Sequence, residues 1–225
     1  LWALVNNAGV QKGFSVELTG IIEFKDTMEV NAIGLVRVTK AFLPLLRQTK
    51  GRVVNVTSLS GRVTMPHLCS YTMSKFAAVA FTECLKQEMQ VWGVKVISVE
   101  PEMFATPIYD SALKHIDETV ASVENHVRAD YGKTFLNCLK QWVASARIMS
   151  SSKVNIVTDA LESAVALEYP DAVYKPCRNL GVRMMWYILE NFPRSTVDWL
   201  MRCAFSLGLW VLRHRKKLKI SHNSD

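Results

Sequence analysis

Residues 52–61 decide the fold class, and they read Arg52-Val53-Val54-Asn55-Val56-Thr57-Ser58-Leu59-Ser60-Gly61. The β-branched first half predicts a buried strand, and the serines and glycine of the second half predict a turn. Apolar runs of the same kind occur at 1–5 and 94–99, and helical periodicity fills 22–46 and 71–91. Because apolar strands that alternate with helices pair in parallel, the pattern predicts an α/β fold whose right-handed crossovers join a parallel sheet.

Composition sets the broad class of protein. The chain has 225 residues, of which 49% are hydrophobic and 21% charged, as expected for one globular domain with a full core. Five of the seven net positive charges fall in the run Arg213–Lys219. No basic–aromatic pattern suited to stacking on bases is present, so no nucleic-acid partner is expected. The five cysteines lack CxxC or CxxH spacing, and the sequence therefore predicts neither a metal site nor a disulfide framework.

The later segments predict the domain organisation. From Met103 to about Ser152 the pattern loosens into short helical stretches, and a candidate short strand follows at 172–174. We expect residues 1–185 to form the main domain and residues 186–225 to form an apolar helical and basic tail. The longest uncharged run of the tail, Cys203–Leu212, has ten residues, fewer than the ~20 that cross a bilayer as a helix.

Tyr71 and Lys75 are the first candidates for chemistry. Residues four apart on a helix project from the same face, so the lysine ammonium is expected beside the tyrosine phenol. A free tyrosine titrates near ~10, and a nearby positive charge lowers that pKa, which suits general acid–base catalysis. The alternative is a half-exposed tyrosine beside a solvated lysine.

Three polar features precede this pair along the chain. Ser58 follows a strand end, where ligands bind in open α/β sheets. Asn31 interrupts an apolar helical stretch, and the turn Asn6-Asn7-Ala8-Gly9 follows the first strand. Each feature by itself could be a cap, a turn or a satisfied buried amide. Together with Tyr71 and Lys75, they favour an active site at the carboxyl edge of the sheet.

The sequence resembles the short-chain dehydrogenase/reductase family, in its branch of steroid, retinol and 3-hydroxybutyrate dehydrogenases. The resemblance is strong from Leu1 to about Thr106 and weaker to the C-terminus. The motifs that resemble the family are Asn6–Gly9, Asn31, Gly51–Ser58, Tyr71–Lys75 and Val99–Pro101 with Thr106. The segments that resemble this branch of the family are 42–46, 92–96 and 130–133. The resemblance implies a Rossmann-like doubly wound parallel sheet, N-terminally truncated, with a helical C-terminal extension.

The resemblance also implies a catalytic role for four residues. Tyr71 would transfer the proton of the substrate oxygen, and Lys75 would lower the Tyr71 pKa and hydrogen-bond the nicotinamide ribose. Ser58 would polarise the substrate oxygen. Asn31 would position a water that links Lys75 to solvent. The cofactor would be NAD, with NADP as the alternative, and Tyr71 and Lys75 would contact it. Asn7, Ala8 and Gly9 would line its adenosine side, and Pro101 and Thr106 would contact its nicotinamide end.

The sequence departs from the family pattern in two places. Glu102 stands where a glycine usually follows Pro101, and its carboxylate either crowds the cofactor or points outward into the substrate loop. The glycine-rich phosphate turn, and the residue that selects NAD or NADP, are absent from these 225 residues. We therefore expect a fragment that lacks two or more strands and leaves a sheet edge exposed.

Residues 103–152 are the expected substrate lid. Apolar side chains there favour a steroid- or retinoid-like alcohol or ketone, and hence a role in lipid metabolism; they are Met103, Phe104, Ile108, Tyr109, Phe135, Leu136 and Trp142. A D-3-hydroxybutyrate dehydrogenase-like enzyme stays open, because Arg128, Lys133 or Arg147 could bind a carboxylate. A third interpretation is a catalytically silent relative that binds a membrane or lipid.

The tail suggests a cellular setting. Its Trp-bearing apolar stretch followed by a basic run suits a membrane surface, whereas the alternative is a helix packed on its own subunit with a solvated basic end. We expect a membrane-associated protein of the endoplasmic reticulum, with the mitochondrion as the alternative. A homo-oligomer is a further expectation.

Overall fold

The computed structural model describes residues 1–203 and 206. Within them the strands are β1 (Ala3–Asn6), β2 (Arg52–Val56), β3 (Lys95–Val99) and β4 (Val173–Tyr174). The α-helices are α1 (Ile21–Met28), α2 (Leu35–Thr49), α3 (Cys69–Met89), α4 (Pro107–Ser122), α5 (Asn125–Met149), α6 (Asn155–Ala166) and α7 (Leu180–Asn191). A π-helical segment, Glu29–Gly34, joins α1 to α2, and short 3-10 turns occupy Leu59–Gly61 and Gln90–Trp92.

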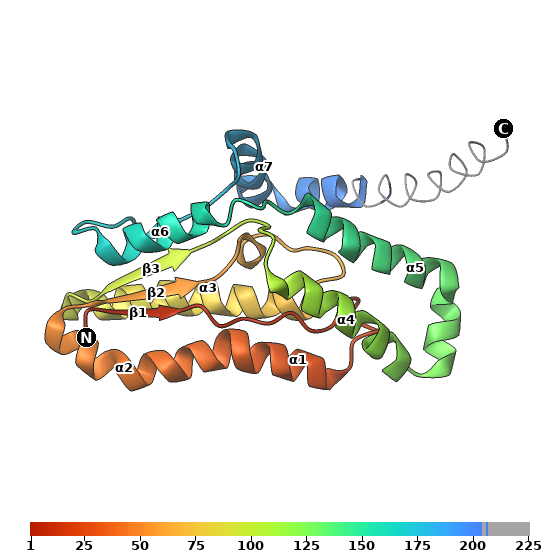
Figure 1. Cartoon of the computed structure of the whole chain (residues 1–225), viewed down its shortest axis with the longest axis horizontal. Coiled ribbons are helices and arrows are strands. Elements are labelled where there is room, and N and C mark those ends of the chain that lie inside the picture. The colour runs from red at the N-terminus through yellow and green to blue at the C-terminus, as the bar shows by residue number, and fades with distance from the viewer. Residues whose placement is uncertain (204–205, 207–225) are drawn as a thin grey trace.

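The described strands form one parallel sheet in the order β1-β2-β3-β4 (Figure 1). Val53 lies beside Val96 and packs under α2 and α3, whereas the next pair, Val54 and Ile97, packs under α6. Helices therefore cover both faces, since successive side chains of a strand point to opposite faces. The predicted α/β doubly wound fold is confirmed, with element ends shifted by one to three residues and the helix expected at 22–46 divided by the π-helical segment.

The β1 edge of the sheet has no strand partner among the described residues. Val5 on this strand is 42% exposed. This agrees with the predicted exposed edge.

The region 103–152 is more regular than the sequence predicts. In place of short helical stretches it holds α4 and the long α5, which kinks at Gly132 (φ 69°, ψ 157°). Figure 1 shows the two helices beside the end of the sheet. A shared apolar core joins them to the loop after β1, and its buried members are Phe14, Leu18, Ala112, Ile116, Leu136, Leu139 and Val143. Non-local packing against that loop accounts for the regularity that periodicity did not indicate.

The C-terminal part described packs back on the main domain. Trp186 of α7 and Val197 are buried against Leu59 and Val63, which follow β2. The expected boundary between residues 185 and 186 falls inside α7, and the two-part division stays a prediction. No helix within residues 1–203 and 206 is long and apolar enough to cross a membrane. The basic run 213–219 lies outside the described residues.

Candidate active site

The carboxyl ends of three parallel strands bring the polar candidates to one edge of the sheet. Asn6 is the last residue of β1 and residues 7–9 follow it, Ser58 follows β2, and Pro101 follows β3. Two hydrogen bonds tie the last two loops together: the Thr57 N–H donates to the Val99 carbonyl (2.8 Å), and the Leu59 N–H donates to the Pro101 carbonyl (3.1 Å). Ser58 is buried, and its hydroxyl accepts a hydrogen bond from the Ser60 N–H at 3.1 Å. The serine is thus held in place by the turn that it begins.

Helix α3 carries the Tyr71–Lys75 pair to the same edge. Lys75 is 4% exposed, its Nζ donates to the Val56 carbonyl at 3.2 Å, and it lies 5.6 Å from the centre of the Tyr71 ring. Burial lowers the pKa of Lys75 to about 8 because the low-dielectric interior disfavours the ammonium. This site therefore brings an ammonium, a phenol and the Ser58 hydroxyl together at one strand end.

The pKa of Tyr71 differs from the sequence expectation. Burial raises it to about 12, and a hydrogen bond with the Ser58 side chain acts in the opposite direction. The expected lowering by Lys75 is not seen. The reason is physical: the same burial that disfavours the phenolate also disfavours the ammonium that would stabilise it.

Asn31 lies in the π-helical segment, and three hydrogen bonds fix its side chain. Its Oδ1 accepts from the Val10 N–H (2.8 Å), and its Nδ2 donates to the Val10 carbonyl (2.8 Å) and to the Ser74 hydroxyl (2.9 Å). A Cβ added at Gly9 would lie 3.6 Å from Asn31 Oδ1 and 3.7 Å from Lys75 Nζ. The glycine, the amide and the ammonium are therefore neighbours, although the water relay expected of Asn31 stays a prediction.

The expected cofactor contacts lie around this centre. Asn7, Ala8 and Gly9 are exposed at the end of β1, while Pro101 and Thr106 are partly buried. Thr106 is the residue immediately before α4. Asn7, Ala8, Gly9 and Pro101 thus lie after the strand ends that carry the site, Thr106 lies at the start of α4, and the contact of all five with a cofactor stays a prediction.

Glu102 is engaged by a residue that the sequence did not single out. Its side chain is 2% exposed, and its Oε2 lies 2.9 Å from Nη2 of Arg178, which follows β4. The backbone N–H of Glu102 donates to the Pro176 carbonyl at 3.1 Å. The carboxylate is therefore neutralised by the C-terminal segment.

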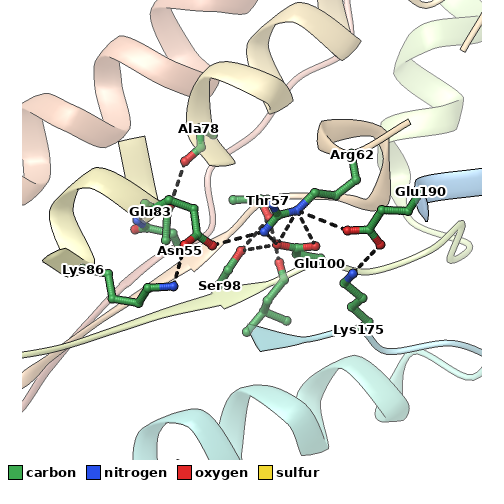
Figure 2. Close-up of polar contacts among 12 residues, drawn as sticks. Asn55, Thr57, Arg62, Ala78, Glu83, Lys86, Ser98, Glu100, Lys175 and Glu190 are labelled. Carbon is green, nitrogen blue, oxygen red and sulfur yellow. Dashed lines mark hydrogen bonds and ion pairs between the residues drawn. The ribbon is translucent and has the colours of Figure 1, made fainter. Parts of the chain in front are cut away.

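The sequence also did not predict a partly buried ion-pair network around Arg62, in the segment that follows Ser58 (Figure 2). Glu100, which is fully buried, accepts from the Arg62 guanidinium at 2.7, 3.1 and 3.2 Å and from the Ser98 hydroxyl at 3.0 Å. Arg62 also donates to Glu83 of α3 at 3.2 Å. The network fixes the segment after Ser58 against β3 and α3. A glutamate that ends an apolar strand run was the available signal.

Comparison with known proteins agrees with this geometry. The family model described as short chain dehydrogenase matches residues 1–117, just over half of the chain. The chain therefore belongs to the short-chain dehydrogenase family.

Its relatives include enzymes of two named activities. The mitochondrial D-beta-hydroxybutyrate dehydrogenase of Rattus norvegicus is 42% identical over 211 residues, covering 88% of this chain and 59% of that protein. The 17-beta-hydroxysteroid dehydrogenase type 2 of Homo sapiens is 34% identical over 212 residues, covering 91% of this chain and 54% of that protein. The chain thus spans a little over half the length of these relatives.

The fold agrees with a solved member of the family. A short chain dehydrogenase/reductase from Burkholderia phymatum, in complex with NAD, superposes with a TM-score of 0.63 at 18% identity. The match covers 84% of this chain and 64% of that one. At this identity the likeness supports the fold alone.

Proposed function

We propose that this chain carries the catalytic centre of a nicotinamide-dependent oxidoreductase that interconverts an alcohol with its ketone or aldehyde. The observation that supports this proposal most strongly is that four side chains converge at one sheet edge in a member of this family: Ser58, Tyr71, Lys75 and Asn31. The rat and human relatives are named as dehydrogenases of a hydroxy acid and of a hydroxysteroid, which supports chemistry at a CH–OH group.

Tyr71 is the proposed proton donor and acceptor. The Ser58 side chain hydrogen-bonds it and thus lies where it can also orient the substrate oxygen. Because burial raises the Tyr71 pKa to about 12, the neutral phenol is the resting form, ready to donate a proton in the reducing direction. In the oxidising direction, the Lys75 ammonium would stabilise the phenolate as it forms.

The donor set of Lys75 fits a nicotinamide cofactor. An ammonium has three N–H donors, and among the described residues Lys75 reaches one acceptor, the Val56 carbonyl. The remaining donors suit ribose hydroxyls, with Gly9 and Asn31 beside them. When bound, the cofactor supplies or accepts the hydride. NAD is the proposed form, with NADP as the alternative.

The lid favours an apolar substrate. His67, which lies just before α3, packs edge-on against Phe135 and Trp142 of α5, at centroid distances of 5.9 and 6.1 Å. Its Nδ1 and the Ser15 hydroxyl are 2.6 Å apart. The aromatic cluster of His67, Phe135 and Trp142 suits contact with a steroid- or retinoid-like compound.

A 3-hydroxybutyrate-like acid is the second candidate, favoured by the 42% identity to the rat enzyme. The candidate cations of the lid are poorly placed to bind the carboxylate of such an acid. Lys133 is exposed, Arg128 donates to the side-chain oxygen of Asn125, and Arg147 is paired with Asp110 at 3.0 Å on the surface.

The setting proposed for the whole protein is a membrane surface. On α7, Leu180, Met184, Tyr187 and Ile188 recur at helical spacing and are 37–73% exposed. An apolar stripe of this kind suits the headgroup region of a bilayer. The rat relative is named as a mitochondrial enzyme, which supports the mitochondrion, and the endoplasmic reticulum stays the other candidate. A homo-oligomer also remains a prediction.

The test uses the protein extended to its natural start. Nicotinamide absorbance is followed with NAD and then NADP, with estradiol, retinol and 3-hydroxybutyrate as substrates. We expect Tyr71→Phe to lower kcat about a hundredfold or more, while Tyr169→Phe, which changes a tyrosine that is 83% exposed, leaves it unchanged. Turnover that survives in Tyr71→Phe contradicts the mechanism. A wild-type protein that binds neither cofactor favours the silent, lipid-binding relative.

A further inference from the structure

The ion pair between Glu102 and Arg178 lies at the base of the lid. The Arg178 Nε is 3.1 Å from each carboxylate oxygen of Glu102, and its Nη2 is 2.9 Å from Oε2. The backbone N–H of Arg178 also donates to the same carboxylate. The Glu102 side chain is 2% exposed and that of Arg178 27%, so the pair is largely removed from water. Charge-assisted, multiply bonded pairs of this kind hold a defined geometry.

The same guanidinium reaches both ends of the lid. Its Nη2 donates to the carbonyl of Met103, where the lid begins, at 3.4 Å. Its Nη1 donates to the carbonyl of Met149, the last residue of α5. A single side chain from the segment after β4 thus holds two lid residues that are 46 positions apart.

Backbone contacts close the same junction. The Ser151 N–H donates to the Met103 carbonyl, and the Ala105 N–H donates to the Ser151 carbonyl, both at 2.9 Å. Phe104 and Ser151 form an isolated parallel β-bridge. The lid is therefore a closed loop whose two ends are fastened to each other, and Arg178 fastens that junction to the sheet.

We propose that Glu102 and Arg178 are positioning residues that hold the lid over the substrate side of the active site. The inference rests on the proposed function and deepens it. Neither residue is placed on the reacting atoms, and Glu102 is next to Pro101 at the proposed nicotinamide end. The pair should therefore govern substrate capture, read as KM, and leave proton transfer by Tyr71 unchanged.

The main variant is Arg178→Met in the full-length protein. It leaves the Glu102 carboxylate buried without its cation, so the junction opens and the lid loses its defined position. We expect KM for the preferred substrate to rise about tenfold to a hundredfold, because small misplacements of binding groups cost that much. We expect kcat to change less than about threefold, and its pH profile to keep its midpoint.

Two variants serve as controls. Lys140→Met breaks another ion pair of the lid, with Asp117, whose side chains are 38% and 69% exposed; we expect KM to stay within about twofold. The double variant Glu102→Met/Arg178→Met removes both charges together, so we expect it to recover part of the loss.

Amide hydrogen exchange provides a readout that does not need turnover. In Arg178→Met we expect faster exchange at 103–110 and 145–151, with unchanged exchange in β2 and β3. This pattern would support the positioning role of Glu102 and Arg178 even if the wild-type protein turned over no tested substrate. Failure of this inference can therefore be told apart from failure of the proposed function. Exchange and KM equal to those of Lys140→Met would overturn the proposal. So would a fall in kcat at unchanged KM, or a double variant no better than the single one.

Discussion

Replacing Lys75 by methionine should stabilise the protein while abolishing its proposed activity. The lysine is 4% exposed, and burial lowers its pKa from the ordinary 10.5 to about 8. That difference corresponds to about 3 kcal/mol of cost for holding the ammonium in the folded state near pH 7. Methionine has a similar length, carries no charge and adapts to irregular spaces.

The net gain is smaller than this cost. The variant also loses the hydrogen bond to the Val56 carbonyl, worth about 1 kcal/mol. We therefore expect Lys75→Met to be more stable by about 2 kcal/mol near neutral pH.

The pH dependence of this gain has a definite sign. Between about pH 8 and 10.5 the unfolded chain keeps the proton on Lys75 and the folded chain has lost it. The unfolded state then binds more protons, so wild-type stability rises with pH across this window. The methionine variant lacks this contribution, and the stability gap should close as the pH approaches 10.

The assay is urea unfolding of the full-length protein without cofactor, near pH 7 and near pH 9.5. Lys40→Met, which replaces an exposed lysine of α2, is the matched control and should change little. The reasoning is refuted if Lys75→Met is less stable than wild type near pH 7, or if the difference does not change with pH.

Two other substitutions, each with a control variant, test the segment that follows Ser58. Arg62→Met leaves the fully buried Glu100 carboxylate without its cation and should lower the free energy of unfolding in urea by about 3–5 kcal/mol. The control Arg37→Met breaks an exposed ion pair and should lower it by less than about 1 kcal/mol. Equal losses in the two variants would contradict the importance of burial. Gly61→Ala places a Cβ 2.7 Å from a backbone oxygen and a side-chain carbon of α3, so it should destabilise by about 1–3 kcal/mol. Gly181→Ala, whose Cβ meets nothing closer than 3.5 Å, should be neutral within about 1 kcal/mol, and calorimetry of both variants would expose an error.

The sequence by itself determined the parallel sheet and the core of the candidate site. Each strand is a local apolar run, and the interval between strands holds a periodic helix, so neighbouring residues carry the whole signal. The same holds for Tyr71 and Lys75, because one helix fixes their spacing. Ser58 could be predicted from the sequence for a related reason, because the end of a strand marks the edge of the sheet before any packing is known.

Only the tertiary structure decided the electrostatics and the partners. The raised pKa of Tyr71 and the lowered pKa of Lys75 come from burial, which depends on the loops and helices that cover α3. Glu102 meets Arg178 across 76 positions, and Glu100 meets Arg62 across 38. Long-range charge pairing leaves no periodic trace in the sequence, because it depends on which surfaces the fold brings together.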